Sequence, residues 1–136
     1  MVSCLCIHTT FEPIIFKKIN RAKIIKLVNE ELDAIGMGRH YKGRVYLTTI
    51  ITIFITDNHE SSDGAIKEAA NEHNVGYSSI MRAVTTAIEN TWYDCDPIVL
   101  KEQYTLHIGD KKKRPTNNEF IHYYAEKIIN LMEADD

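Results

Sequence analysis

The residues best suited to chemistry lie in the segment AANEHNVGYSSIMRAV, which spans residues 69–84. A helix-turn-helix needs a small residue where its two helices touch, a residue that tolerates a left-handed backbone in the turn, and apolar anchors on both sides of the turn. At the expected offsets, these requirements are met by Ala70, Asn74, Val75, Ile80 and Ala83. A plain helical hairpin in an all-α protein would satisfy the same spacing, so the pattern predicts two helices and a tight turn and leaves their function open.

The second helix of a helix-turn-helix presents its early exposed side chains to the major groove of DNA. Here those candidate side chains are Ser78, Ser79, Met81, Arg82, Thr85 and Thr86. Arg82 has the most specific chemistry among them, because an arginine can donate two hydrogen bonds to the O6 and N7 atoms of guanine. The same arginine could instead pair with Glu89 or remain solvated.

A second candidate region is the basic run KKKR at residues 111–114. Flexible cations suit phosphate oxygens, which supply most of the sequence-independent affinity for DNA. We therefore consider Lys112, Lys113 and Arg114 as phosphate contacts, together with Thr116 and Asn117 at the amino end of the following helix, where backbone N–H groups attract anions. The alternatives are that the run is a solvated loop and that Thr116 and Asn117 only cap the helix.

Neither a metal centre nor an enzyme active site is predicted. The C-x-C-x-H run at residues 4–8 could begin a metal site if it were extended, but its spacing is not that of common zinc motifs. Asp94, Asp96 and His107 could act as acids and bases, but no nucleophile elbow, glycine-rich phosphate loop or H-E-x-x-H motif accompanies them. We expect no bound metal, no cofactor and no catalysis.

Helices must position these residues. A helix from Asn20 as its N-cap to Gly36 is indicated by apolar residues at three- and four-residue steps. The loop that follows it carries Arg39, His40, Lys42 and Arg44, which could face an anion or only water. The segment Val45–Thr56 is rich in β-branched residues and is compatible with a strand or with a buried helix.

Further helices are predicted on both sides of the motif. The first half of the hairpin runs from about Ile66 to His73 and ends at Asn74, and the second half covers Tyr77–Trp92. Pro97 can start a short helix that reaches about Tyr104, with Asp96 before it. Thr116 and Glu119 form a T-x-x-E capping box at the start of an amphipathic last helix.

Composition favours one soluble globular domain, since the 136 residues are 44% hydrophobic and 26% charged with a formal net charge of −3. The three cysteines match no disulfide framework, and the amino terminus lacks a signal-peptide pattern, so we expect a cytoplasmic protein. The longest apolar stretch, Val45–Ile55, has 11 residues, whereas a membrane helix needs about 20. Residues 57–96 carry a net charge of −6, which should weaken DNA binding.

From about Leu32 to Met132 the sequence resembles the C-terminal DNA-binding domain of the stage-zero sporulation response regulators. The resemblance is carried by three blocks: IGMGRHYKGRVYL at residues 35–47, the hairpin at residues 74–92, and PTNNEFI at residues 115–121. It implies an all-α fold of about six helices around a central helix-turn-helix, with Val45–Thr56 as a helix. It also implies binding to short promoter boxes in double-stranded DNA, often as a tandem dimer.

Individual positions both keep and depart from the family pattern. Arg82 falls where the family has the arginine that reads guanine. Ser79 and Thr85 replace basic residues of the DNA-contacting set, and Met81 replaces an acidic residue of that set. Arg114 replaces a lysine on the phosphate side. About thirty residues precede the match, so we expect no phosphoreceiver domain in this chain and no phosphorylation control in cis.

We therefore predict an irregular arm over residues 1–18 and a helix-turn-helix DNA-binding domain over residues 19–136. The predicted function is that of a sequence-specific transcriptional regulator without phosphoreceiver control, acting alone, as a homodimer, or as a heterodimer with a related regulator. The alternative is a degenerate helix-turn-helix that serves as a protein-binding or dimerisation module with a full-length relative. No membrane partner is expected.

Overall fold

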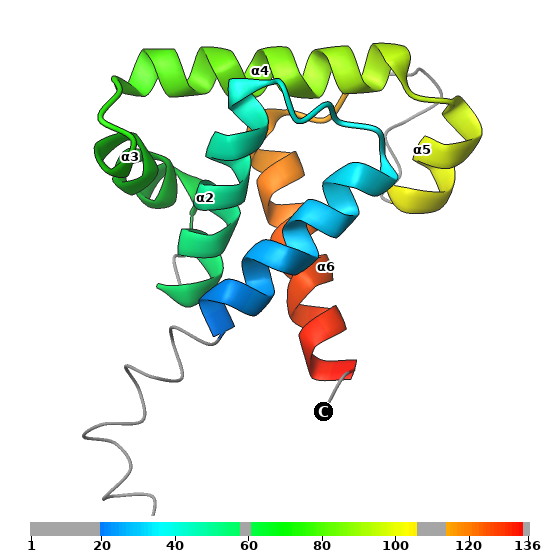
Figure 1. Cartoon of the computed structure of the whole chain (residues 1–136), viewed down its shortest axis with the longest axis horizontal. Helices are drawn as coiled ribbons and strands as arrows, with labels where there is room; N and C mark the ends of the chain where they lie inside the picture. The colour runs from blue at the N-terminus through cyan, green and yellow to red at the C-terminus, as the bar shows by residue number, and fades with distance from the viewer. Residues whose placement is uncertain (1–19, 58–60, 106–113, 135–136) are drawn as a thin grey trace, which may run out of the picture.

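The computed structural model describes residues 20–57, 61–105 and 114–134. All regular structure in these ranges is helical, which confirms the predicted all-α class. The first helix occupies residues 20–34 of the described part. It is followed by α2 (Lys42–Thr56), α3 (Ser62–Glu72), α4 (Tyr77–Asp94), α5 (Pro97–Gln103) and α6 (Asn117–Ala134) (Figure 1). The arm predicted over residues 1–18 lies outside the described residues.

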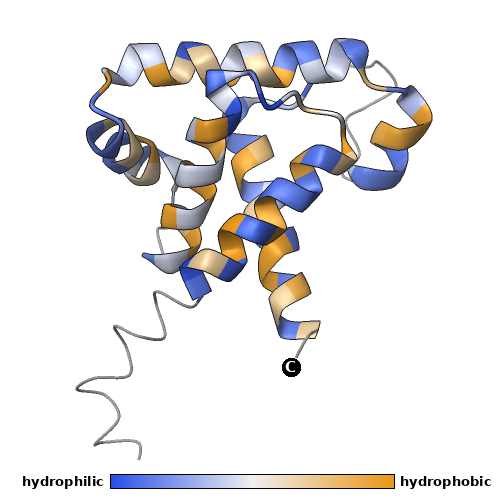
Figure 2. Ribbon diagram, in the orientation of Figure 1, coloured by the Kyte–Doolittle hydropathy of each residue, from blue (hydrophilic) through white to orange (hydrophobic). Residues whose placement is uncertain are grey.

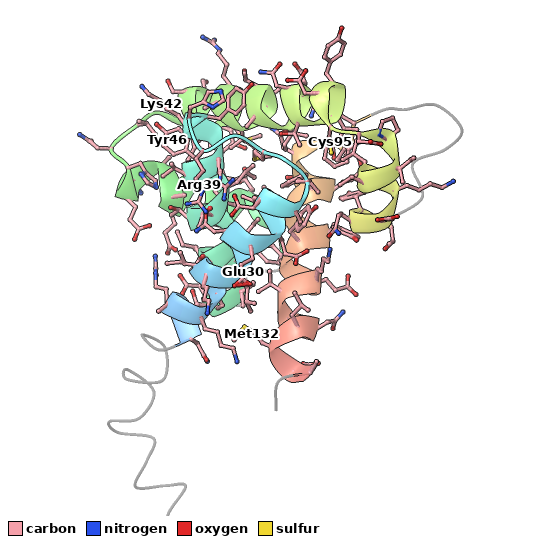
Figure 3. All side chains as sticks on the ribbon, turned by 45° about the vertical axis from the view of Figure 1, so that its right-hand side comes forward. Glu30, Arg39, Lys42, Tyr46, Cys95 and Met132 are labelled. Carbon is pink, nitrogen blue, oxygen red and sulfur yellow. The ribbon has the colours of Figure 1, made fainter. Side chains whose placement is uncertain are left out.

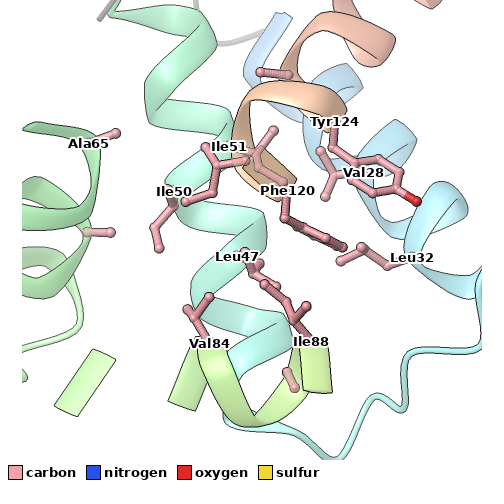
Figure 4. Packing of buried hydrophobic residues seen from close by; sticks show 14 of the residues in the cluster. Val28, Leu32, Leu47, Ile50, Ile51, Ala65, Val84, Ile88, Phe120 and Tyr124 are labelled. Carbon is pink, nitrogen blue, oxygen red and sulfur yellow. The ribbon is translucent and has the colours of Figure 1, made fainter. Parts of the chain in front are cut away.

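Helix α4 lies across one end of the molecule, and the first helix, α2 and α6 extend away from it (Figure 1). Helix α2 is central, because its contacts with α3, α4 and α6 are each more extensive than those that these three helices make with one another. Figure 2 shows apolar residues on α2, α6 and the first helix where these helices meet. The core that results includes Val28, Leu32, Leu47, Ile51, Val84, Ile88, Phe120 and Tyr124 (Figure 4).

The segment Val45–Thr56, which sequence alone leaves undecided, belongs to helix α2. Its apolar side chains are buried on more than one side of the helix, since Leu47, Ile50, Ile51 and Ile53 are all 2% exposed or less. Its threonine hydroxyls donate back to carbonyl oxygens one turn earlier, as Thr52 does to Thr48 at 2.7 Å. Burial outweighs the weak β preference of the residues, as the family resemblance implied, and the internal hydrogen bonds satisfy the threonine hydroxyls.

Most of the predicted helix ends are confirmed. Gly36 and Asn74 adopt the left-handed backbone, with φ of 75° and 56°. The Asp96 side chain accepts a hydrogen bond from the Ile98 N–H at 2.8 Å, directly before Pro97 in the first position of α5. Two predicted helix starts differ from the structure: Asn20 is already helical and is not an N-cap, and α3 begins at Ser62, one turn before the predicted Ile66.

The short helix α5 is held against the first helix and α6 by polar contacts. The Gln103 carbonyl accepts hydrogen bonds from the Tyr123 hydroxyl at 3.0 Å and from Lys127 Nζ at 2.9 Å. Lys127 also forms an ion pair with Glu31 of the first helix. Tyr104 is buried at this junction, where desolvation, with smaller contributions from Glu119 and Tyr123, raises the pKa of its hydroxyl. The junction therefore fixes the end of α5 on the bundle.

Two of the four basic residues predicted in the loop before α2, Arg39 and Arg44, pair with Asp33, and Arg44 lies within α2 and not in the loop. The Arg44 side chain is 3% exposed and donates hydrogen bonds to the Met37 carbonyl and to the carbonyl and side-chain oxygens of Asn29. It also pairs with Asp33 at 2.7 Å, and Arg39 pairs with the other oxygen of the same carboxylate at 2.8 Å. Arg44 therefore ties α2 to the first helix and is not available to an external anion.

Helix α2 approaches α4 at backbone distance next to Gly43. A Cβ atom built on Gly43 would lie 2.1 Å from the Ala83 carbonyl oxygen and 2.8 Å from the Ala87 Cβ. Neither neighbour is a flexible side chain that could swing away. The position therefore requires glycine for packing reasons, although its backbone is ordinary helix.

We expect Gly43→Ala to lower the free energy of unfolding by about 1–3 kcal/mol or more, because overpacking must push α2 and α4 apart. Urea unfolding followed by circular dichroism measures this loss. Gly76→Ala is the matched control: φ there is −76° and no atom lies within 4 Å of the added Cβ. The control should lose less than about 1 kcal/mol as an N-cap change, and equal losses in both variants would contradict the packing explanation.

The Asp33 ion pairs predict a pH dependence of stability. Hydrogen bonds from Arg39 and then Arg44 lower the pKa of Asp33 below its ordinary value of 3.8. Because the folded-state pKa is depressed, this contribution to stability is complete above the unfolded pKa and is lost as the pH falls through the folded pKa. The stability gap between the wild type and Asp33→Asn should therefore shrink between pH 6 and pH 3, measured by urea unfolding. A gap that stays constant would exclude this ionic contribution.

Candidate nucleic-acid interface

Helices α3 and α4 form the predicted helix-turn-helix. The turn between Glu72 and Tyr77 contains Asn74 in its left-handed conformation, and the Val75 N–H closes it by donating to the Ala70 carbonyl at 2.9 Å. Among the anchors expected from sequence, Ala70 and Ile80 are buried, and Val75 packs against the core. The residue pattern that predicted a helix-turn-helix from the sequence therefore forms that motif in the structure.

The outward face of α4 carries four of the predicted DNA-contacting residues: Ser78, Ser79, Arg82 and Thr86 are all exposed. Within the described part of the chain, the Arg82 side chain makes no hydrogen bond or ion pair. Its alternative partner, Glu89, pairs instead with Arg114, whose Nε lies 3.4 Å from a Glu89 carboxylate oxygen. Arg82 is therefore available to a ligand outside the protein.

An open groove of about 350 Å³ runs between the start of α2 and this face of α4. One wall of the groove consists of α4 residues that share one face of that helix. The other wall consists of the first residues of α2 and the residue before them. The lining residues are Tyr41, Lys42, Gly43, Ser79, Arg82, Ala83 and Thr86. Figure 3 shows Lys42 at the start of α2, beneath α4. Sequence reasoning placed Lys42 in a basic loop and did not assign it to this site.

Two residues of the predicted contact set face inward. Met81 was expected on the exposed face, but it is partly buried and packs against the hydrophobic core. It lies three residues before the buried Val84, so the helical period places it at the edge of the inner stripe. Thr85 is also partly buried, and its hydroxyl accepts a hydrogen bond from Asn117 Nδ2 at 2.9 Å. A Met81→Glu substitution would therefore disturb packing.

The first turn of α6 holds both helices of the motif. Asn117 donates to Thr85 of α4, and the next residue, Asn118, accepts a hydrogen bond from the buried hydroxyl of Ser62 at the start of α3. The PTNN block of the sequence is thus a clamp on the helix-turn-helix. Asn117 was predicted as a DNA contact, and in the structure its side chain is used to position α4.

The capping box before α6 is complete. The Thr116 hydroxyl accepts from the Glu119 N–H at 3.1 Å, and the Thr116 N–H donates to the Glu119 carboxylate at 2.9 Å. The Thr116 N–H, with a smaller contribution from the Thr116 hydroxyl, lowers the pKa of the Glu119 carboxyl. Arg114 is partly buried beside them, within 3.5 Å of the Asn117 side-chain oxygen. The predicted phosphate contacts Lys112 and Lys113 lie outside the described residues.

The acidic residues of segment 57–96 are mostly engaged away from Arg82. Asp63 accepts a hydrogen bond from the Tyr77 hydroxyl at 2.8 Å, which together with Lys67 lowers the pKa of Asp63. Glu72 pairs with Arg21 at 3.1 Å. Helix α2 contains no carboxylate, and neither does α4 before Glu89. The net charge of −6 therefore does not describe the groove, whose lining charges are both positive.

Among residues 20–57, 61–105 and 114–134, no group of three His, Cys, Asp or Glu side chains could hold a metal ion. The C-x-C-x-H run and His107 lie outside these ranges. Asp96 serves as a helix cap. Burial, together with the charge of Asp96, raises the pKa of the partly buried Cys95 thiol. In the same ranges, every helix is too short or too polar to span a lipid bilayer.

An all-α domain whose helix-turn-helix leaves an unpaired arginine on its second helix has the architecture of a DNA-binding protein. Residues 28–128, well over half of the chain, match the family described as "Sporulation initiation factor Spo0A C terminal". The protein belongs to this family, which confirms the resemblance seen in the sequence. The family is one of transcription-factor DNA-binding domains and not an enzyme class.

The clamp on α4 can be tested with a double-mutant cycle. We expect Thr85→Val and Asn117→Ala each to lower the free energy of unfolding, with a coupling energy of about 0.5–1.5 kcal/mol, the usual net value of one hydrogen bond. The control pair is Thr86→Val with Asn117→Ala, because the exposed Thr86 hydroxyl donates to the Arg82 carbonyl of its own helix and has no bond to α6 among the described residues. Coupling that is the same in both cycles would show that the bond does not hold α4.

Proposed function

We propose that the protein is a sequence-specific DNA-binding transcriptional regulator that places α4 in the major groove of a promoter box. The observation that carries this proposal is the state of Arg82, which is exposed on the outward face of the second motif helix and has no partner in the described protein. A guanidinium in this position can donate two hydrogen bonds to a guanine edge. Arg82 is the base-reading residue of the proposal.

The exposed hydroxyls around Arg82 complete the contact surface. Ser78 and Ser79 lie in the first turn of α4, and Thr86 lies one turn beyond Arg82. Hydroxyls can donate to or accept from bases and phosphates, so they adapt to several sequences and add little discrimination by themselves. Lys112 and Lys113 are proposed as phosphate contacts beside the motif. Binding of two copies to adjacent boxes, or pairing with a related regulator, extends the proposal to the tandem arrangement of the family.

The proposal also sets the expected selectivity. Met81 is partly buried against the core and the Thr85 hydroxyl is bonded to Asn117, so neither takes the place of the acidic and basic base contacts of the family pattern. One guanine contact from Arg82 then dominates discrimination. Binding should be weaker and less selective than in a domain that retains the full set.

The test is an electrophoretic shift with a duplex carrying the family's box, compared with a scrambled duplex and with single-base variants of the box. Arg82→Ala should cost about 1–3 kcal/mol on the box, and much less on the variant that lacks the contacted guanine. Arg21→Ala is the control, because Arg21 is a half-exposed arginine of the first helix that pairs with Glu72. The Arg21→Ala variant should bind the box with the same affinity as the wild type.

Two other outcomes have defined meanings. Equal losses by Arg82→Ala on every duplex would make Arg82 a phosphate contact. No binding by the wild type to any duplex would reject the proposal in favour of a protein-binding module that pairs with a full-length relative.

A further inference from the structure

We infer that Lys42, at the start of α2, is a phosphate contact that fixes the DNA backbone against the face read by Arg82. The inference rests on the proposed function and adds a binding residue outside the helix-turn-helix. The observation behind it is that one groove is lined by Lys42 together with Ser79, Arg82 and Thr86.

Lys42 is placed by the backbone contact that follows it in the chain. Gly43 lets α2 approach the Ala83 carbonyl, so the residue before Gly43 lies beside α4 at the level of residues 79–86. Arg44 points into the protein, where it is held by Asn29, Met37 and Asp33. Lys42 is exposed and has no hydrogen bond or ion pair within the described residues. The ammonium group is therefore kept on the surface, next to the contact helix.

The local charge favours an anion in this groove. Lys42 and Arg82 are the charged residues of its lining, and both are cationic. No carboxylate occurs in α2 or in α4 before Glu89, and Glu89 is paired with Arg114. Two unpaired cations on one groove are stabilised when an anion binds between or beside them.

The position of Lys42 selects phosphate and not a base edge. Lysine provides a compact charge on a flexible stem, without the planar fork that matches guanine. Its Cα belongs to α2, beside the helix that would enter the major groove, and the sugar-phosphate backbone forms the wall of that groove. A contact of this kind sets the register of α4 on the duplex and carries no sequence information by itself.

The experiment measures the dissociation constant of the full chain for the box duplex and its single-base variants, at several salt concentrations. Lys42→Gln should weaken binding about fivefold to tenfold near 0.1 M salt, by the same factor on every duplex. It should also lower the slope of log affinity against log salt by about one. Lys42→Arg, which keeps the charge, should retain the wild-type slope.

Lys101→Gln is the matched control, because Lys101 is exposed on α5 and outside the groove lining, and its removal changes the net charge equally. It should leave the slope unchanged. Ethylation of individual phosphates gives an independent readout: one ethylated phosphate should weaken the wild type and have no effect on Lys42→Gln.

The outcomes separate this inference from the proposed function. If the wild type binds the box and Lys42→Gln behaves like Lys101→Gln, the inference is overturned and the proposed function stands. A loss confined to one base variant also overturns it, because Lys42 would then contact a base. If the wild type binds no duplex, the proposed function fails and the inference fails with it. Thermal unfolding of both lysine variants checks that neither loss comes from misfolding.

Discussion

The arrangement of the whole domain depends on the contact of Gly43 with the Ala83 carbonyl. Because Gly43 has no side chain, the backbones of α2 and α4 can lie close together. This close approach determines where α4 packs across the other helices. The residues on either side of Gly43 then face opposite environments. Arg44 enters the protein and joins α2 to the first helix, while Lys42 stays in the groove beside α4. The absence of a side chain at Gly43 thus helps to position both Arg44 inside the protein and Lys42 on its surface.

Helix α4 is fixed from its other flank by the start of α6. The hydrogen bond between Asn117 and Thr85 and the ion pair between Arg114 and Glu89 join α6 and the residues before it to α4. Ser62 and Asn118 do the same for α3. A helix that presents side chains to a ligand needs a defined orientation, and here side chains from two separate parts of the chain supply it.

The features that sequence reasoning predicted well are local. The helix-turn-helix anchors, the left-handed Asn74 and the Thr116–Glu119 box depend on residues a few positions apart. Burial and proximity between distant segments could not be predicted in this way. Val45–Thr56 stayed ambiguous because its helical state comes from burial against three helices. Arg44 and Met81 were expected at the surface because their inward orientation depends on the packing of α2 and α4.

The outward face of α4 makes few side-chain contacts with the rest of the described fold. Ser78, Ser79 and Arg82 are exposed, and their side chains form no bonds to the rest of the described protein. Substitutions there disturb little internal packing, so under the proposed function the specificity of this domain is free to diverge during evolution. Thr85 and Met81 are constrained by their internal contacts. A new specificity would therefore arise at positions 78, 79 and 82 before it could arise elsewhere on the helix.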